Sequence, residues 1–397
     1  MNKKLIAVAV ASALGTPAVA MAQASTVQIY GTGYIEYSVA DQGSAFNGAN
    51  FVDVDQFQTP GSNIGFKGEE ALGGGLSAWF QCESTASMNT AGAAFCSRNS
   101  ALGFKGGFGN VFLGQWDTPF KRTQGVTRGI VNETGIYGTA FLMGGNSSTY
   151  AGNASAGAFI RRQSNTFNYD SPRFGGFQAM AAVSTGQATG TGVTSNVPNS
   201  KPRLWSIGLQ YVNGPLAVTG AYEKHNNFGT TSIAGTGTTS AAAGSGSDKG
   251  WHVGATYTFP VGGGLKVGAI YMRTEYELAA GDAEHAAFQI AGDWKIAGPH
   301  GVRAAYVKAR DTKGPAAGLL PAGSVISGTG IGATDGNNGA DLWQVIYYYT
   351  FSKRTEAGIG YVKLDNDSAG RYALGGLPNG RQGNNQDAFA VHVKHTF

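Results

Sequence analysis

The sequence predicts an all-β protein: a sixteen-stranded antiparallel β-barrel that spans a membrane. Three observations lead to this fold. Glycine supplies 63 of 397 residues and charged residues only 13%, against roughly 7% and 25% in typical globular proteins. Segments of about ten residues alternate apolar and polar side chains, and their connections alternate between short and long. Beyond the first two dozen residues no run of 18 apolar residues occurs, which excludes a membrane-spanning helix there.

The N-terminus has the three parts of a secretory signal peptide. Lys3 and Lys4 precede an apolar stretch at 5–14, and small residues lead to Ala22. We expect cleavage after Ala22, with Ala24 as the near alternative. The expected domains are a signal peptide at 1–22 and a barrel domain at 23–397. An N-terminal anchor is the alternative interpretation, but the apolar stretch is too short for one.

Net charge gives no support for nucleic-acid binding. The formal charge of +4 falls to +2 once Lys3 and Lys4 are removed, so no basic surface dominates the mature chain. The chain has two cysteines, Cys82 and Cys96, which would close a loop of 15 residues. In an oxidising compartment such a pair favours a disulfide. Two unpaired thiols are the alternative.

Strands are predicted wherever the alternation has a period of two. At 27–39 the odd positions are mainly apolar and the even positions mainly polar. The same pattern recurs at 203–211, 251–259, 285–296, 343–351 and, finally, 387–397. Large aromatics stand near the ends of the apolar faces, as the interfaces of a membrane favour. The apolar faces would meet lipid, and the other faces a polar lumen.

The connections supply the strand count. Short turns are expected at 72–75, 106–109, 171–176, 213–215, 260–264, 298–301 and 352–354. Long segments are expected at 40–61, 84–97, 118–161, 185–202, 225–250, 276–284, 310–340 and 365–386. Fifteen connections join sixteen strands. Short periplasmic turns and long extracellular loops are typical of outer-membrane barrels, and a barrel of this size leaves an aqueous channel. Closure is required because lipid cannot satisfy an open sheet edge.

Several motifs resemble one protein family. They are VQIYG at 27–31, GFKGEEALGGGL at 65–76, GGFG at 106–109, LG at 113–114, TP at 118–119, RQSNTFNYDSP at 162–172 and KHTF at 394–397. Together they resemble the Gram-negative general porins of the β-proteobacterial and neisserial type, over essentially the whole mature chain. The resemblance implies a homotrimer of passive diffusion pores in the cell outer membrane. It also implies that the third loop folds inward to form the constriction.

The third loop, about 117–159, carries the candidate pore residues. Those of the loop and the facing wall are Asp117, Lys121, Arg122, Arg128, Glu133, Arg161 and Arg162. Five are basic and two acidic. Positive side chains in a narrow, low-dielectric channel attract anions, so we expect a mild anion preference led by Arg122, Arg128 and Arg162. One departure matters: Gln115 stands where the family commonly has arginine, and a balanced, unselective pore is the competing account.

The resemblance also implies partners. The terminal Phe397 would be recognised by the outer-membrane insertion machinery, and the barrel would contact outer-membrane lipid and lipopolysaccharide. Small hydrophilic solutes and inorganic ions would pass through the pore. No cofactor, metal or nucleic acid is expected.

Two other functions are alternatives to be considered for such a chain. His392 and His395 form H-x-x-H, but on a strand they point to opposite faces and cannot share a metal. No nucleophile elbow, H-E-x-x-H or P-loop occurs. An outer-membrane barrel hydrolase, with a serine–histidine pair assembled across strands, is one alternative. An adhesin or receptor role of the surface loops is the other, and it is compatible with transport.

Overall fold

The structure is a computed structural model of the chain. It describes residues 27–43, 52–90, 94–131, 134–144, 159–185, 203–226, 247–278, 281–314, 336–377 and 383–397. The expected signal peptide and its cleavage site lie outside these residues.

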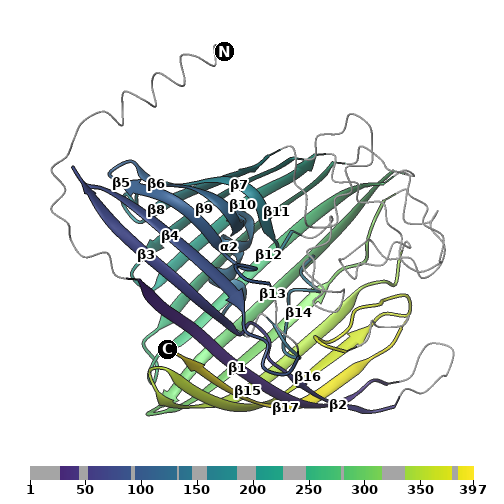
Figure 1. Ribbon diagram of the computed structural model, residues 1–397. Helices are drawn as coiled ribbons and strands as arrows, with labels where there is room; N and C mark the ends of the chain where they lie inside the picture. Colours follow the sequence, from purple (N-terminus) through teal and green to yellow (C-terminus); the bar gives the residue numbers. More distant parts are fainter. Residues whose placement is uncertain are drawn as a thin grey trace.

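One antiparallel sheet closes on itself to form the barrel (Figure 1). Its strands are β1 (Gln28–Asp41), β2 (Val54–Gln58), β3 (Asn63–Gly73), β4 (Leu76–Thr85), β5 (Ser100–Gly106), β6 (Gly109–Asp117), β7 (Arg162–Asp170), β8 (Phe177–Ser184), β9 (Arg203–Asn213), β10 (Leu216–Asn226), β11 (Asp248–Phe259), β12 (Leu265–Leu278), β13 (Gly281–Ala297), β14 (His300–Ala309), β15 (Ala340–Ser352), β16 (Thr355–Asn366) and β17 (Gln386–Thr396). β2 and β3 pair with successive stretches of the same edge of β1. They act as one interrupted strand, so the barrel has sixteen strands, as predicted.

The last residues of the chain close the barrel. β17 pairs with β1 from Thr32↔Thr396 to Asp41↔Asp387. Beyond the strand, the Phe397 amide donates to the Gly31 carbonyl at 3.1 Å, and the Gly31 amide donates back at 3.2 Å. This seam satisfies backbone groups that would otherwise face lipid without partners.

The alternation of side chains is confirmed on the strands. In β1, Ile35 and Val39 are exposed on the outside, whereas Glu36 and Ser38 are buried inside. The outward faces of the later strands carry large apolar side chains, such as Trp251. Because the period is two, a residue's face follows from its position along the strand, except beyond a β-bulge such as the one between Gly114 and Trp116 in β6.

The seven expected short turns are present, but two expected long loops differ: β2 occupies part of the loop expected at 40–61, and the loop expected at 276–284 is absent. Instead of ending near 276, β12 pairs with β13 as far as Leu278↔Gly281. The expectation for 276–284 was therefore wrong. The two strands stay paired although Glu277 lies opposite Asp282, and Glu284 forms an ion pair with Arg273, just before that stretch. Within the described ranges, no helix is both long and apolar enough to cross a membrane.

The connection between β6 and β7 folds into the barrel. It begins with helix α2 (Pro119–Arg128), which lies inside the barrel and contacts the inner faces of β8 to β13. Thr118 caps the helix by accepting a hydrogen bond from the Lys121 amide at 3.3 Å, and Pro119 occupies the first turn. The buried side of α2, including Phe120 and Thr127, faces the wall.

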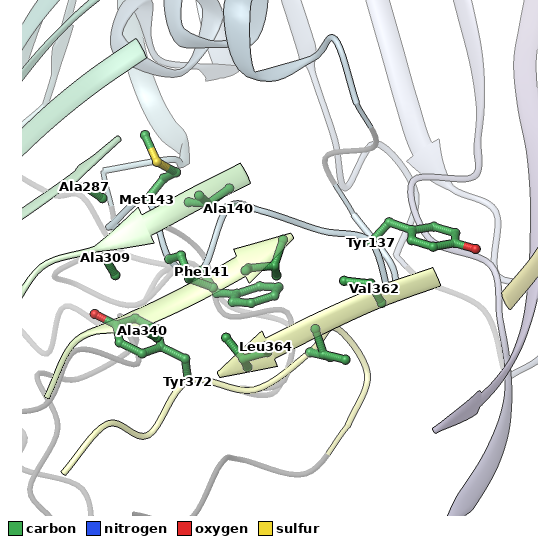
Figure 2. Close-up of a cluster of buried hydrophobic side chains, with 14 of the residues drawn as sticks. Tyr137, Ala140, Phe141, Met143, Ala287, Ala309, Ala340, Val362, Leu364 and Tyr372 are labelled. Carbon is green, nitrogen blue, oxygen red and sulfur yellow. The ribbon is translucent and has the colours of Figure 1, made fainter. Parts of the chain in front are cut away.

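The inner wall is not polar throughout, in contrast to the sequence-based expectation. On β13 to β16, inward side chains such as Val362 and Leu364 form an apolar cluster with Phe141 of the third loop (Figure 2). Tyr372, from the connection between β16 and β17, packs against the same cluster. The apolar wall gives the inward-folded segments a surface to pack against, which removes both from water.

Candidate pore constriction

Three of the predicted residues meet where the third loop leaves and rejoins the wall. The Lys121 ammonium donates to the Asp117 carboxylate at 2.9 Å, and the Arg162 guanidinium lies 3.2 Å from the same oxygen. Two cations therefore share one carboxylate. The three side chains are 17–21% exposed, so water still reaches them. Their arrangement leaves one positive charge in excess.

Arg122 connects the helix to the wall of β7. Its guanidinium donates two hydrogen bonds to the Asp170 carboxylate, at 2.8 and 2.7 Å. Its side chain is 25% exposed and that of Asp170 is 12% exposed. Bidentate geometry of this kind is strong and directional. It holds Arg122 on the channel-facing side of α2, opposite the side that packs on the wall.

Asn99 organises this cluster, and no sequence signal singled it out. Its side-chain oxygen accepts from Arg162 Nε at 2.7 Å and from the Asp117 amide at 3.0 Å. Its side-chain nitrogen donates to the Asp117 carboxylate at 3.2 Å. Asn99 comes from the connection between β4 and β5, so its proximity to Asp117 depends on the closed sheet.

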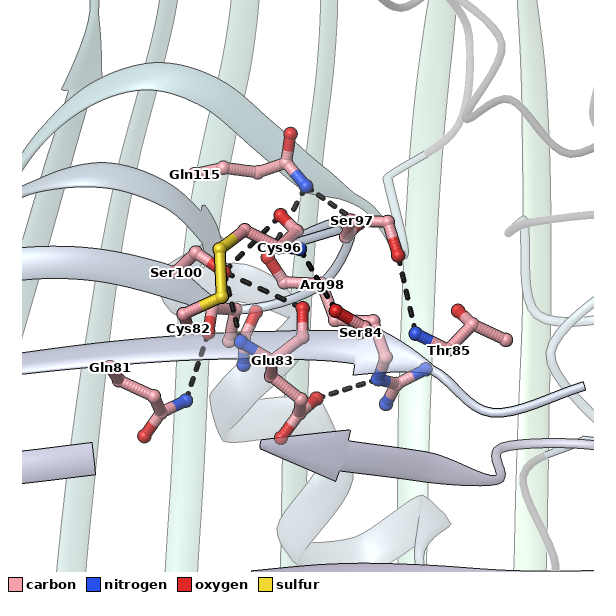
Figure 3. Close-up of a disulfide and its surroundings, with 11 residues drawn as sticks. Gln81, Cys82, Glu83, Ser84, Thr85, Cys96, Ser97, Arg98, Ser100 and Gln115 are labelled. Atoms are coloured by element: carbon pink, nitrogen blue, oxygen red, sulfur yellow. Dashed lines mark hydrogen bonds and ion pairs between the residues drawn. A yellow bond between two sulfur atoms is a disulfide. The ribbon is translucent and has the colours of Figure 1, made fainter. Parts of the chain in front are cut away.

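A disulfide joins Cys82 to Cys96, three residues before Asn99 in the chain (Figure 3). The next residues are fastened to the end of β4. The Arg98 amide donates to the Glu83 carbonyl at 2.8 Å, and its guanidinium pairs with the Glu83 carboxylate at 2.6 Å. The bridge thus limits the movement of the segment that carries Asn99.

Gln115 has a different task from the arginine that commonly stands at its position. Its side-chain amide donates to the Ser97 carbonyl at 2.7 Å and to the Arg98 carbonyl at 3.3 Å (Figure 3). It therefore fastens the disulfide-bridged loop to β6.

The structure places Arg128 and Arg161 behind the loop. Both are 1% exposed. Arg128 Nε donates to the Gln124 side chain at 3.2 Å, on the side of α2 that faces the wall. Burial lowers the pKa of Arg161 to about 10, although the carboxylates of Glu223 and Asp248 oppose the shift. Arg161 stays charged at neutral pH. Glu133 lies outside the described residues.

The third loop is also fastened to the far wall. The Ile136 amide donates to the Glu36 carboxylate at 2.8 Å, and the Tyr137 hydroxyl donates to the Ala390 carbonyl at 2.7 Å. Burial raises the pKa of Tyr137, so it remains a neutral donor. The loop is held at both ends and in its middle, as a constriction requires.

The channel-facing charges around this cluster are more basic than acidic. We compare the described charged groups of β3 to β7, their connecting segments and α2 that face inward and stay in contact with water. The basic ones are Lys67, Arg98, Lys105, Lys121, Arg122 and Arg162. The acidic ones are Glu69, Glu83, Asp117 and Asp170. Each carboxylate has a basic partner. Two positive charges remain uncompensated.

The described residues offer no grouping of three metal-ligating side chains. The two terminal histidines lie on opposite sides of β17. His392 is buried inside, 3.5 Å from the Glu356 carboxylate, whereas His395 is outside, 2.9 Å from the Thr355 hydroxyl.

Comparison with known proteins decides the family. The family model described as Gram-negative porin matches residues 7–369. The chain belongs to the Gram-negative porin family. This porin is 32% identical over 234 residues to the major outer membrane protein P.IB of Neisseria meningitidis, covering 57% of this chain and 61% of that protein. The corresponding protein of Neisseria gonorrhoeae is 27% identical over 223 residues, covering 54% of each chain. The matches thus span less than two thirds of these relatives.

Solved structures agree with the fold. An anion-selective porin from Comamonas acidovorans superposes with a TM-score of 0.71 at 20% identity, covering 94% of this chain and 100% of the other. The trimer form of OmpT from Vibrio cholerae gives 0.62 at 16% identity, with 94% and 100% coverage. Family and barrel together place this porin in the outer membrane, as predicted.

Proposed function

We propose that this porin is a passive diffusion pore for small hydrophilic solutes and inorganic ions. We further propose that it works as a homotrimer and mildly prefers anions. The observation that carries the proposal is the excess of channel-facing basic groups where the third loop narrows the barrel. Lys121 and Arg162 share the single carboxylate of Asp117 there.

The physical basis is the field of these charges in a confined channel. Low-dielectric walls focus the field, so uncompensated cations raise the local anion concentration. Pairing with carboxylates keeps the preference mild. The anion-selective Comamonas neighbour and the trimeric Vibrio neighbour support this assignment. Three arginines were predicted to lead the preference, and the proposal retains Arg122 and Arg162. Arg128 is buried on the side of α2 that faces the wall, so we give it a structural role.

Planar-bilayer recording of the purified trimer tests the proposal. We expect large, stable, nearly ohmic steps, and a reversal potential in a KCl gradient that shows anion preference in dilute salt. The preference should fade near 1 M salt, where the Debye length is about 3 Å. Cation preference in dilute KCl would contradict the proposed selectivity. The proposal includes no enzymatic activity, and hydrolysis without conductance would contradict the pore itself.

A further inference from the structure

A cavity of about 400 Å³ opens in the barrel wall beside the proposed constriction. Its lining residues are Gln28, Lys67, Glu69, Trp79, Gln81 and Lys105, with Gly68 and Phe80 completing it. They come from β1, β3, β4 and β5. The polar ones and Trp79 occupy strand positions that face the channel, because the alternate positions, such as Leu102, are exposed on the outside. A cavity of this volume suits a small organic solute.

Trp79 forms a fixed aromatic surface in this cavity. Its indole N–H donates to the Asn110 side chain at 2.7 Å. Its ring lies 5.3 Å from that of Phe112 and 5.8 Å from that of Trp116, between centroids. It also lies against the backbone at Gly103, where an added Cβ would stand 2.9 Å from the indole nitrogen. A ligand ring that stacks here meets a surface whose conformation is already set, so little entropy is lost.

The cavity also carries an uncompensated positive charge. Lys105 pairs with Glu69, and both side chains remain nearly half exposed. Lys67 has no carboxylate within ion-pair distance among the described residues. Its ammonium lies 5.0 Å from the centroid of the Tyr30 ring. An anionic group that enters the cavity therefore finds a free ammonium and an exposed lysine beside the indole.

A chain of contacts joins the cavity to the constriction. The Tyr30 hydroxyl next to Lys67 donates to the Glu83 carboxylate at 3.1 Å, and Glu83 pairs with Arg98. Arg98 precedes Asn99, which holds the Asp117 and Arg162 side chains. These contacts place the Lys67 site and the constriction on the same part of the wall.

We propose that this cavity is a binding subsite for aromatic carboxylates on their way through the pore. The ring stacks on Trp79, and the carboxylate pairs with Lys67 and with the exposed Lys105. The inference rests on the proposed pore function and names a solute class for it. A neutral sugar would use the indole but not the ammonium groups, whereas an inorganic anion would use the ammonium groups but not the indole. Only a solute with both parts uses the whole site.

Single-channel recording with three probes tests the subsite on the intact trimer. Benzoate has the ring and the charge, acetate has only the charge, and benzyl alcohol has only the ring. We expect benzoate to reduce the KCl current in a saturable manner, at concentrations roughly three- to tenfold below those of the other two probes. Equal potency of benzoate and acetate would overturn the proposal while leaving the pore function intact. Absence of KCl steps would instead overturn the pore function.

Variants separate the two halves of the site. Trp79→Leu should raise the half-blocking benzoate concentration roughly three- to tenfold, and Trp79→Phe should raise it less. Lys67→Gln should weaken block by benzoate but not by benzyl alcohol. Lys266→Gln, which removes the same charge from β12 outside the cavity, is the matched control and should leave benzoate block unchanged. Unaltered benzoate block in Lys67→Gln, or equal loss in Lys67→Gln and Lys266→Gln, would overturn the site. The lysine variants test whether the cavity binds benzoate even if Trp79→Leu does not assemble.

Discussion

At the scale of single residues, the solvation of a charge decides what it does for the channel. Arg122 and Arg128 belong to the same helix, yet Arg122 is partly exposed beside Asp170 and Arg128 is buried. Six positions separate them, so their side chains point about 120° apart around the helix axis. One side of α2 packs on the wall, so the other must face the channel. A count of charges along the sequence cannot make this distinction.

The first prediction concerns selectivity. Replacing Arg122 and Arg162 by alanine removes two channel-facing cations and leaves Asp170 without its partner and Asp117 with Lys121 alone. We expect the anion-to-cation permeability ratio in dilute KCl to fall roughly two- to threefold, because the local potential becomes less positive. The reversal potential in a KCl gradient measures this.

Arg128→Ala is the control for that experiment. It removes one positive charge from the helix that also carries Arg122, but at a buried position. The reversal potential should move less than in the double variant. A larger shift in Arg128→Ala than in the double variant would mean that the channel runs on the other side of α2.

At the scale of elements, buried polar groups hold the third loop in place against the wall. Arg161, where the loop returns to β7, lies in the field of Glu223 on β10 and Asp248 on β11. The guanidinium offsets the repulsion between the two buried carboxylates, so removing it destabilises the group. The loop therefore depends on strands that are distant in the sequence.

The second prediction follows from this anchor. Arg161→Gln should remove the guanidinium from Glu223 and Asp248 and leave them beside His225, at a cost of about 3–5 kcal/mol. We expect noisier single-channel currents and more frequent closures, because the loop loses its fixed position. Adding Glu223→Gln to Arg161→Gln should partly restore quiet currents. Wild-type current noise in the single variant would contradict an anchoring role for Arg161.

The third prediction concerns the disulfide between β4 and β5. Replacing both Cys82 and Cys96 by serine should lower the free energy of unfolding by about 2–4 kcal/mol, because the unfolded chain gains loop entropy. The shift from the compact to the heat-denatured band in electrophoresis without reductant provides the measurement. Reductant should lower the transition of the wild type and leave that of the double serine variant unchanged. An identical transition in both proteins would contradict the stabilising role.

At the scale of the whole molecule, the seam between the first and last strands decides whether a barrel exists. Phe397 exchanges two backbone hydrogen bonds with Gly31. Its ring lies over that glycine, where an added Cβ would stand 2.6 Å from a ring carbon. The side chain is still 51% exposed on the outer surface. The terminal residue therefore closes the sheet and presents an aromatic group outward.

The fourth prediction concerns assembly. Deleting Phe397 should leave export across the inner membrane intact but reduce the amount of heat-modifiable, SDS-resistant trimer in the outer membrane severalfold. The loss combines two open backbone groups at the seam with the absence of the aromatic that we expect the insertion machinery to recognise. Quantitative electrophoresis of unheated outer-membrane fractions measures it.

Phe397→Tyr separates the two causes because it keeps the seam and an aromatic ring. Its trimer yield should stay close to that of the wild type. Equal yields for the deleted and full-length chains would contradict the prediction.

The strands were predictable because lipid and water impose a local rule. A side chain on a spanning strand faces one or the other, so its polarity alternates with the backbone. The alternating strands followed from that rule, and the connections between them gave the strand count of sixteen, but β2 was missed because it lies within the loop expected at 40–61. The rule failed at 276–284, where glycine and charged residues suggested a loop. Backbone pairing of β12 with β13, which a sequence pattern does not show, continues through this stretch as far as Leu278 and Gly281.

The constriction depended on contacts between segments far apart in the sequence. The charges of 117–162 were visible in the sequence, but their burial was not, since the packing of α2 on β8 to β13 decides it. Asn99 and Gln115 gained their roles only because the closed sheet brings the bridged loop beside β6 and β7. By itself the sequence thus determined the barrel, because alternation is a property of neighbours along the chain. Tertiary structure alone decided which charged side chains face the channel, because their solvation depends on which distant segments pack against them.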